Sequence, residues 1–429
     1  MALTYGRKLN PHRRLREPLG AKGIRLSRVI TCNPSTIDQN QQLLIRFPDL
    51  GANNVIVPGT TRLAFTISLN SKDANCSVVQ NLGRAIVKQT TVKISGNEVM
   101  SIDDSDVYYC YTDLWKSPQE RRNGQYQGID TSEGRNVTKL RVGAADADRE
   151  VESDQAIANA YGNRYFVPLD FELLETHMPF YQSSLGDRLE YELIFQDYSH
   201  VIVANDAEAG YKIDNVSLEF DTVNHPDLAR QIRNQYAGRL AILYDRVLRH
   251  RIIKANKRDP LWNINLNVPA RSMKGILLLS KDPAAAFSHD SEAFYNPKIA
   301  KVEVCIEGES NQVYIRGMRS YQQWDEARKL FAGGHKRDPT TAAVAKDLDS
   351  ADVSLGEYLT DKFALWLDLR TTDDDQLHGA GRRIENASEG VTIQITKKAE
   401  AAGVLDIYLY VIMDAQLNIE DGRYVSALF

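Results

Sequence analysis

The feature that most constrains this chain is a series of short alternating or wholly apolar runs that recurs from Gln41 almost to the C-terminus. Residues 63–69 form one such run, and Thr91–Ile94 forms another, which ends at the turn-forming pair Gly96-Asn97. Runs of roughly four to eight residues bounded by turn residues are typical of β-strands. Because such runs dominate both halves, the sequence predicts an all-β protein built from β-sandwiches.

The length of the chain indicates how many hydrophobic cores it forms. A chain of 429 residues is too long for one compact core and suits two domains of roughly 200 residues each. Hydrophobic residues make up 43% of the chain and charged residues 25%, which is the composition of a folded globular protein. We therefore expect two β domains in tandem.

The two halves also repeat each other in order. Residues 164–171 (RYFVPLDF) align without gaps to residues 362–369 (KFALWLDL). A strand with a glycine turn at 92–96 aligns in the same way to 304–308, with nearly the same spacing. Short matches arise by chance in all-β chains, but the preserved order favours duplication of one domain.

Helical signals are few, and one of them marks the boundary between the domains. Pro226 near the first helical position and Gly238 beyond the last predict a short helix midway along the chain. Ser320, followed by an apolar face that ends at Phe331, predicts a second helix. The expected organisation is an N-terminal arm, a first domain, a junction helix and a second domain, at residues 1–37, 38–225, 226–238 and 239–429.

The sequence lacks the local signatures of catalysis and of cofactor binding. It has no Gly-x-x-x-x-Gly-Lys-Ser/Thr loop, no HxH or HExxH pair and no Gly-x-Ser-x-Gly turn. Its four cysteines are widely spaced, so neither a disulfide framework nor a zinc site is expected. The acidic run Asp373–Asp375 could bind a hard cation, although a solvated turn is the simpler interpretation. We expect no enzyme, cofactor or metal site, while a triad assembled from distant residues stays open.

Membrane insertion and secretion also lack support in the sequence. The apolar run 404–413 is shorter than the roughly 20 residues of a membrane span and contains Asp406. The N-terminus is basic but has no apolar segment of the kind that a cleaved secretory signal contains. These features predict synthesis in the cytoplasm.

The N-terminal segment carries a charge opposite to that of the rest. Residues 1–28 hold eight basic residues against the single acid Glu17, and the remaining chain holds 44 basic and 56 acidic residues. A basic segment without apolar periodicity predicts an extended arm that contacts a neighbouring copy, another protein or nucleic acid, and a solubilising tail is the alternative. The candidate contact residues are Arg7, Lys8, Arg13, Arg14, Arg16, Lys22, Arg25 and Arg28.

Two segments carry a resemblance to a known family. The first runs from Tyr295 through Gly308, Gly317 and the Trp324 helix, and the second covers 405–429 with Leu417-Asn418-Ile419. They resemble the double jelly-roll major capsid proteins of the Polinton (Maverick) and adintovirus-like DNA viruses. The resemblance implies that the two domains are tandem eight-stranded jelly-roll sandwiches with a few short helices.

The family also implies a role. Such chains form homotrimeric, pseudo-hexagonal capsomers (hexons) that tile an icosahedral capsid, so the expected partners are further copies of the chain, minor capsid or penton proteins and, through the basic arm, packaged DNA. The expected location is the virion capsid, after synthesis in the host cytoplasm and with assembly in the nucleus left open. The alternatives are a cupin-like or lectin-like binding protein or enzyme, and a penton-like capsid accessory protein.

Overall fold

The structure is a computed structural model that describes most of the chain from Gly23 onward. The residues outside the description are 1–22, 58, 73–76, 117–120, 122–123, 130–163, 170–188, 205–208, 236–237, 269, 284–289, 311–313, 315, 332–352, 372–380, 386–389, 421–422 and 429. The acidic run Asp373–Asp375 lies among them. In the described part strands dominate and helices are short, which confirms the predicted fold class.

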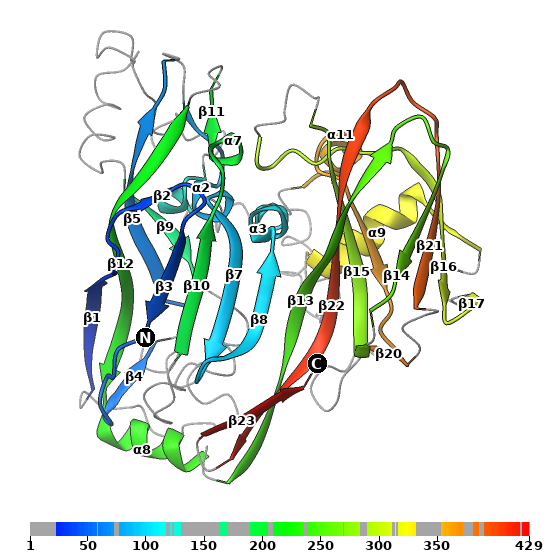
Figure 1. The fold of residues 1–429 in the computed structure, drawn as a ribbon. Coiled ribbons are helices and arrows are strands. Elements are labelled where there is room, and N and C mark those ends of the chain that lie inside the picture. Colours follow the sequence, from blue (N-terminus) through cyan, green and yellow to red (C-terminus); the bar gives the residue numbers. More distant parts are fainter. Residues whose placement is uncertain are drawn as a thin grey trace, which may run out of the picture. The chain divides into compact units, whose positions relative to one another are not determined.

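The first half of the chain forms two antiparallel sheets (Figure 1). One sheet has the order β1 (Ile24–Thr31), β12 (Gly210–Asn224), β5 (Arg62–Asn70), β9 (Arg164–Pro168). The other has the order β3 (Gln42–Arg46), β10 (Leu189–Phe195), β7 (Val87–Ile94), β8 (Asn97–Asp103). When these strands are numbered along the chain, the sheets have the orders 1-8-3-6 and 2-7-4-5, which is the jelly-roll topology.

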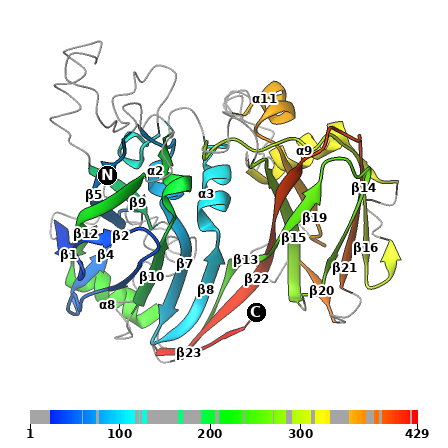
Figure 2. The ribbon, with the colours of Figure 1, turned by 45° about the horizontal axis from the view of Figure 1, so that its top comes forward.

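The second half repeats this order strand for strand. Its first sheet contains β13 (Arg239–Asn256), β22 (Val404–Glu420), β15 (Ala270–Lys281) and β19 (Ala364–Asp368) in sequence across the sheet. Its second sheet contains β14 (Leu261–Leu266), β21 (Val391–Lys397), β16 (Ile299–Ile306) and β17 (Glu309–Ser310). Both halves are therefore jelly rolls, and the second view shows each pair of sheets (Figure 2).

The segments that repeat in the sequence occupy equivalent strands. Residues 164–168 form β9 and residues 364–368 form β19, the sixth strand of each jelly roll. The turn after β7 has Ser95 at φ 51° and Gly96 at φ 80°, and the turn after β16 has Glu307 at φ 51° and Gly308 at φ 82°. A turn with two positive φ values matches the right-handed twist of the strands that it joins, which explains the glycine at the second position.

Shorter elements complete the fold. The remaining strands are β2 (Ile37–Asp38), β4 (Asn54–Ile56), β6 (Ser77–Val78), β11 (Ile202–Val203), β18 (Met318–Arg319), β20 (Arg382–Ile384) and β23 (Arg423–Leu428). The helices of the described residues are α2 (Leu82–Ala85), α3 (Ser105–Asp113), the 3-10 turn η1 (Gln125–Gln127), α7 (Tyr198–Val201), α8 (Pro226–Gln235), α9 (Ser320–Phe331) and α11 (Leu355–Thr360). Helices α8 and α9 lie where the capping signals predict them.

The described chain divides into two compact units, and each takes a segment from the other half of the sequence. The first unit comprises the chain up to Ser105, Tyr126–Asp245 and Ala415–Leu428, and the second comprises Asp106–Gln125 and Arg246–Asp414. Phe65, Phe195 and Phe220 are fully buried in the first unit. Trp366, Tyr410 and Phe294 are fully buried in the second. Each buried aromatic side chain contributes roughly 2–3 kcal/mol of apolar transfer free energy.

Candidate assembly surfaces

The structure describes two of the eight basic residues that the sequence marks as contact candidates. Arg25 and Arg28 lie on β1, which pairs antiparallel with β12 from Ile24 opposite Asn224 to Thr31 opposite Ser217. Arg25 forms an ion pair with Asp221 of β12. Arg7, Lys8, Arg13, Arg14, Arg16 and Lys22 lie outside the described residues.

The first sheet therefore begins inside the segment that the sequence marks as an arm. Backbone hydrogen bonds to β12 hold residues 24–31 at the edge of the sheet, and such bonds require no buried apolar face. The side chains of Ile24 and Val29 are 63% and 64% exposed. Among the described strands, β12 is the one that pairs with β1.

The outer face of the β3-β10-β7-β8 sheet carries cross-strand ion pairs. Arg46 on β3 bonds Glu190 on β10 with 2.8 Å between Nε and Oε1. Lys93 on β7 forms an ion pair with Glu192 on β10. The alternation of each strand directs these side chains to solvent, and opposite charges on neighbouring strands stabilise a sheet modestly.

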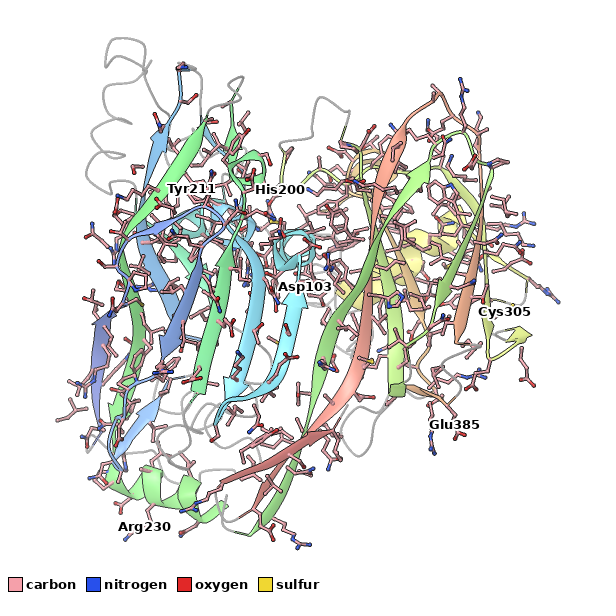
Figure 3. All side chains as sticks on the ribbon, in the orientation of Figure 1. Asp103, His200, Tyr211, Arg230, Cys305 and Glu385 are labelled. Atoms are coloured by element: carbon pink, nitrogen blue, oxygen red, sulfur yellow. The ribbon has the colours of Figure 1, made fainter. Side chains whose placement is uncertain are left out.

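The equivalent outer face of the second jelly roll carries few charges across β14, β21 and β16, and β18 places Arg319 beside Lys301 at its margin. The strand register places its side chains in three rows, which run Leu261–Thr396–Lys301, Asn263–Gln394–Glu303 and Asn265–Thr392–Cys305 across β14, β21 and β16. Lys301 and Glu303 form an ion pair of 2.8 Å and so neutralise each other. Figure 3 shows Cys305 on β16 at this face. We call these nine residues the neutral face.

Strand β14 also differs from other edge strands of the protein. Among the strands that end the four main sheets of the described chain, β14 is the one whose residues (LWNINL) include no charge. Charged side chains on an edge strand normally prevent pairing with another molecule. The alternation of Leu261–Leu266 in the sequence already predicts that Asn263 and Asn265 point outward.

The second unit instead places charge in its interior. The Arg121 guanidinium donates to both carboxylate oxygens of Glu292 at 3.1 and 3.0 Å, and both side chains are less than 10% exposed. Burial raises the pKa of Glu292, and the positive charge of Arg121 opposes that rise. Lys281 donates to the carbonyl oxygens of Asp290 and Ser291 at 3.2 and 3.1 Å, and burial lowers the pKa of its ammonium group.

Neither a metal centre nor a membrane helix is found in the described residues. They contain no group of three or more His, Cys, Asp or Glu side chains arranged to hold a metal ion. No helix in that part of the chain is long and apolar enough to cross a membrane. The surfaces described above are therefore the features on which a functional proposal can rest.

Comparisons with known proteins agree with the topology. No family model matches the chain, and no curated protein matches it either. Among solved structures it is similar to the PBCV-1 virus capsid (TM-score 0.60, 10% identity, 97% of this chain and 98% of that chain). It is also similar to the Faustovirus major capsid protein (0.58, 10%, 95% and 92%) and the mavirus major capsid protein (0.51, 11%, 97% and 92%). At this identity the similarity establishes the double jelly-roll fold.

Proposed function

We propose that this chain is the major capsid protein of an icosahedral DNA virus and forms trimeric, pseudo-hexagonal capsomers. One observation carries the proposal: two successive jelly rolls of identical strand order, in an arrangement that matches capsid proteins over 97% of the chain. The protein's work is then assembly, in which apolar contacts hold the capsomer together and more polar contacts join capsomers into a shell. The proposed location is the virion capsid.

The oligomeric state of the purified protein tests this function. Size-exclusion chromatography with light scattering should give three times the chain mass of 48.3 kDa, and electron microscopy should show pseudo-hexagonal particles. A stable monomer would contradict the proposal, and a pentamer would indicate a penton-like accessory protein. Stoichiometric metal in an elemental analysis, or specific binding on a glycan array, would favour a cupin-like or lectin-like protein instead.

We assign the arm a role in joining capsomers or holding the genome. Residues 1–22 contain six of the basic candidates, and the rest of the chain is acidic and could receive them from a neighbouring copy. The Polinton and adintovirus-like group is the proposed viral group, and its support is the resemblance of the 295–324 and 405–429 segments. Proposed partners are further copies, minor capsid or penton proteins, and packaged DNA.

Deleting residues 1–22 tests the arm separately from the capsomer. Because β1 begins at Ile24, this truncation leaves the first sheet complete. Trimers should form as in the full chain, while shell assembly or DNA content should fall. Particles of normal number and DNA content from the truncated chain would overturn this role.

A further inference from the structure

The helix that follows the first jelly roll in the sequence begins at a buried histidine. His225 is 7% exposed and precedes Pro226, the first residue of α8. Its Nδ1 accepts a hydrogen bond from the backbone N–H of Leu228 at 3.1 Å, so the imidazole occupies the place of a helix N-cap. Leu228 is itself buried, and the ring satisfies an N–H group for which the helix has no internal partner.

Two further segments of the first unit contact the same residue. The backbone N–H of His225 donates to the carbonyl oxygen of Asn53 at 3.0 Å, and its carbonyl oxygen accepts from the N–H of Ala229 at 2.9 Å. Gly23 lies against the ring, since a methyl group at this position would be 3.1 Å from Cδ2 of His225. His225 therefore connects the start of α8 to the residues that precede β1 and β4.

This arrangement requires a neutral imidazole. A protonated imidazole carries hydrogen on both nitrogen atoms, so its Nδ1 can no longer accept from Leu228. Its positive charge would also lie at the N-terminus of α8, where the helix dipole favours negative charge. Burial adds a desolvation cost for the charged ring. The capped state therefore excludes the imidazolium, whereas a state in which the first turn of α8 has opened admits it.

The charged side chains on the described segments that meet at the imidazole already have partners. In α8, Asp227 forms an ion pair with Arg230 at 2.6 Å, and Figure 3 labels Arg230 on this helix. At the adjoining ends of β1 and β12, Arg25 forms an ion pair with Asp221. In the turn before β4, the carboxylate of Asp49 accepts from a backbone N–H at 2.9 Å. These carboxylates have donors of their own, so they do little to stabilise a charged imidazole.

We propose that His225 is an acid-sensitive cap, whose protonation opens the first turn of α8. Histidine is the side chain whose charge ordinarily changes between about pH 5 and 8. Because the opened state binds the additional proton, acidification across this range shifts the population from the capped to the opened first turn. Helix α8 follows β12 and precedes β13, so the opening occurs in the segment that links the two jelly rolls in the sequence. The cap belongs to the first unit alone, so it responds to acid whether or not the chain assembles.

Two substitutions of His225 and one matched control separate its protonation from other effects of acid. His225→Asn keeps an acceptor at the N-cap but does not titrate, and Asn is among the strongest N-cap residues. His225→Ala removes the cap at every pH. His200→Asn is the control, because His200 is an exposed histidine on α7, at the opposite end of the first unit from α8 (Figure 1, Figure 3).

Hydrogen–deuterium exchange with mass spectrometry at about pH 8 and about pH 5 is the measurement. Amide exchange itself slows in acid, so the rate for α8 in wild type is divided by the rate for α8 in His225→Asn at the same pH. This ratio should be near one in the basic sample and about threefold to tenfold higher in the acidic sample. The rate in His225→Ala should exceed that in His225→Asn by about the same factor in both samples, and His200→Asn should behave as wild type.

A ratio that is the same at both pH values would overturn the proposal, and so would equal protection of α8 in His225→Ala and His225→Asn. Loss of the acid response in His200→Asn would also overturn it, since the response would then originate away from the cap. Exchange in β10 is the internal reference for folding and should be equal in all variants at each pH. If His225→Ala does not fold, the comparison of wild type with His225→Asn decides alone.

Discussion

The two jelly rolls have the same strand order but differ in how deeply some of their ion pairs are buried. In the first unit the paired cations lie at the surface, as with Arg46, whose side chain is 60% exposed beside Glu190. The second unit also has exposed pairs, such as Lys301 with Glu303, but it adds buried ones. Arg121 and Glu292 have side chains that are 8% and 7% exposed, and Lys274 and Asp414 are similarly buried. One scaffold thus accommodates ion pairs both at its surface and in its interior.

Exposed and buried ion pairs have different effects on the protein. Surface pairs between neighbouring strands keep a face soluble and contribute little to folding. Buried pairs cost desolvation energy, but they join segments that are distant in sequence: 171 positions separate Arg121 from Glu292. The second unit therefore uses interior charge to hold Arg121 against Glu292.

Breaking the buried ion pair between Arg121 and Glu292 should cause the largest loss of stability. Arg121→Met leaves the Glu292 carboxylate in the interior without the Nη2 donor that contacts both of its oxygens, and we expect a loss of about 3–5 kcal/mol in the free energy of unfolding. Urea denaturation monitored by tryptophan fluorescence measures it. Arg46→Met is the matched control in the first unit, with an expected loss below about 1 kcal/mol. Equal losses for the two variants would remove the distinction between the units.

The sequence predicts the strands and their repetition because these depend on local patterns. Alternation within Val391–Lys397 and the turn at Glu307-Gly308 are visible in a few consecutive residues, and the structure places both as expected. The aromatic residues of α3 are also evident in the sequence. Their location is not, since Tyr111 packs edge-on against Phe294 with ring centroids 4.9 Å apart, and no local pattern links positions so far apart.

The surfaces were harder to predict than the fold. The basic residues of Ile24–Thr31 favour an extended arm, whereas the β-branched and aliphatic residues of the same segment suit an edge strand. In the structure this segment is a strand that pairs with β12. The neutral face depends on register across three strands. Asn263 and Gln394 are neighbours because β14 pairs with β21, and that pairing cannot be deduced from either run alone.

Measuring stability as a function of pH tests what the buried Lys281 contributes to the second unit. Burial lowers its pKa in the folded protein, while the negative charges of Asp106 and Asp290 oppose that shift and the positive charge of Lys362 adds to it. Between that lowered pKa and the unfolded value of about 10.4, the unfolded chain binds more protons, so stability rises with pH across this window. We expect the stability of wild type relative to Lys281→Met to increase as the pH rises toward ~10.

The control for this series is Lys212→Met, which removes an exposed lysine from β12 in the first unit. Its stability should change with pH in parallel with wild type, and urea midpoints at each pH provide the data. A constant difference between wild type and Lys281→Met would show that the buried ammonium does not titrate within the window.

The smallest expected effect concerns the surface pairs of the first unit. Arg62 bonds Glu219 at 3.0 Å, and its guanidinium lies 3.9 Å from the centre of the Phe166 ring, yet its side chain is 47% exposed. Water and salt screen such a pair, so a double-mutant cycle of Arg62→Ala with Glu219→Gln should give a coupling below about 1 kcal/mol that weakens in 1 M salt. A coupling of about 3–5 kcal/mol, as expected for the loss of Arg121, would contradict this prediction. It would mean that exposed and buried ion pairs stabilise the two units equally.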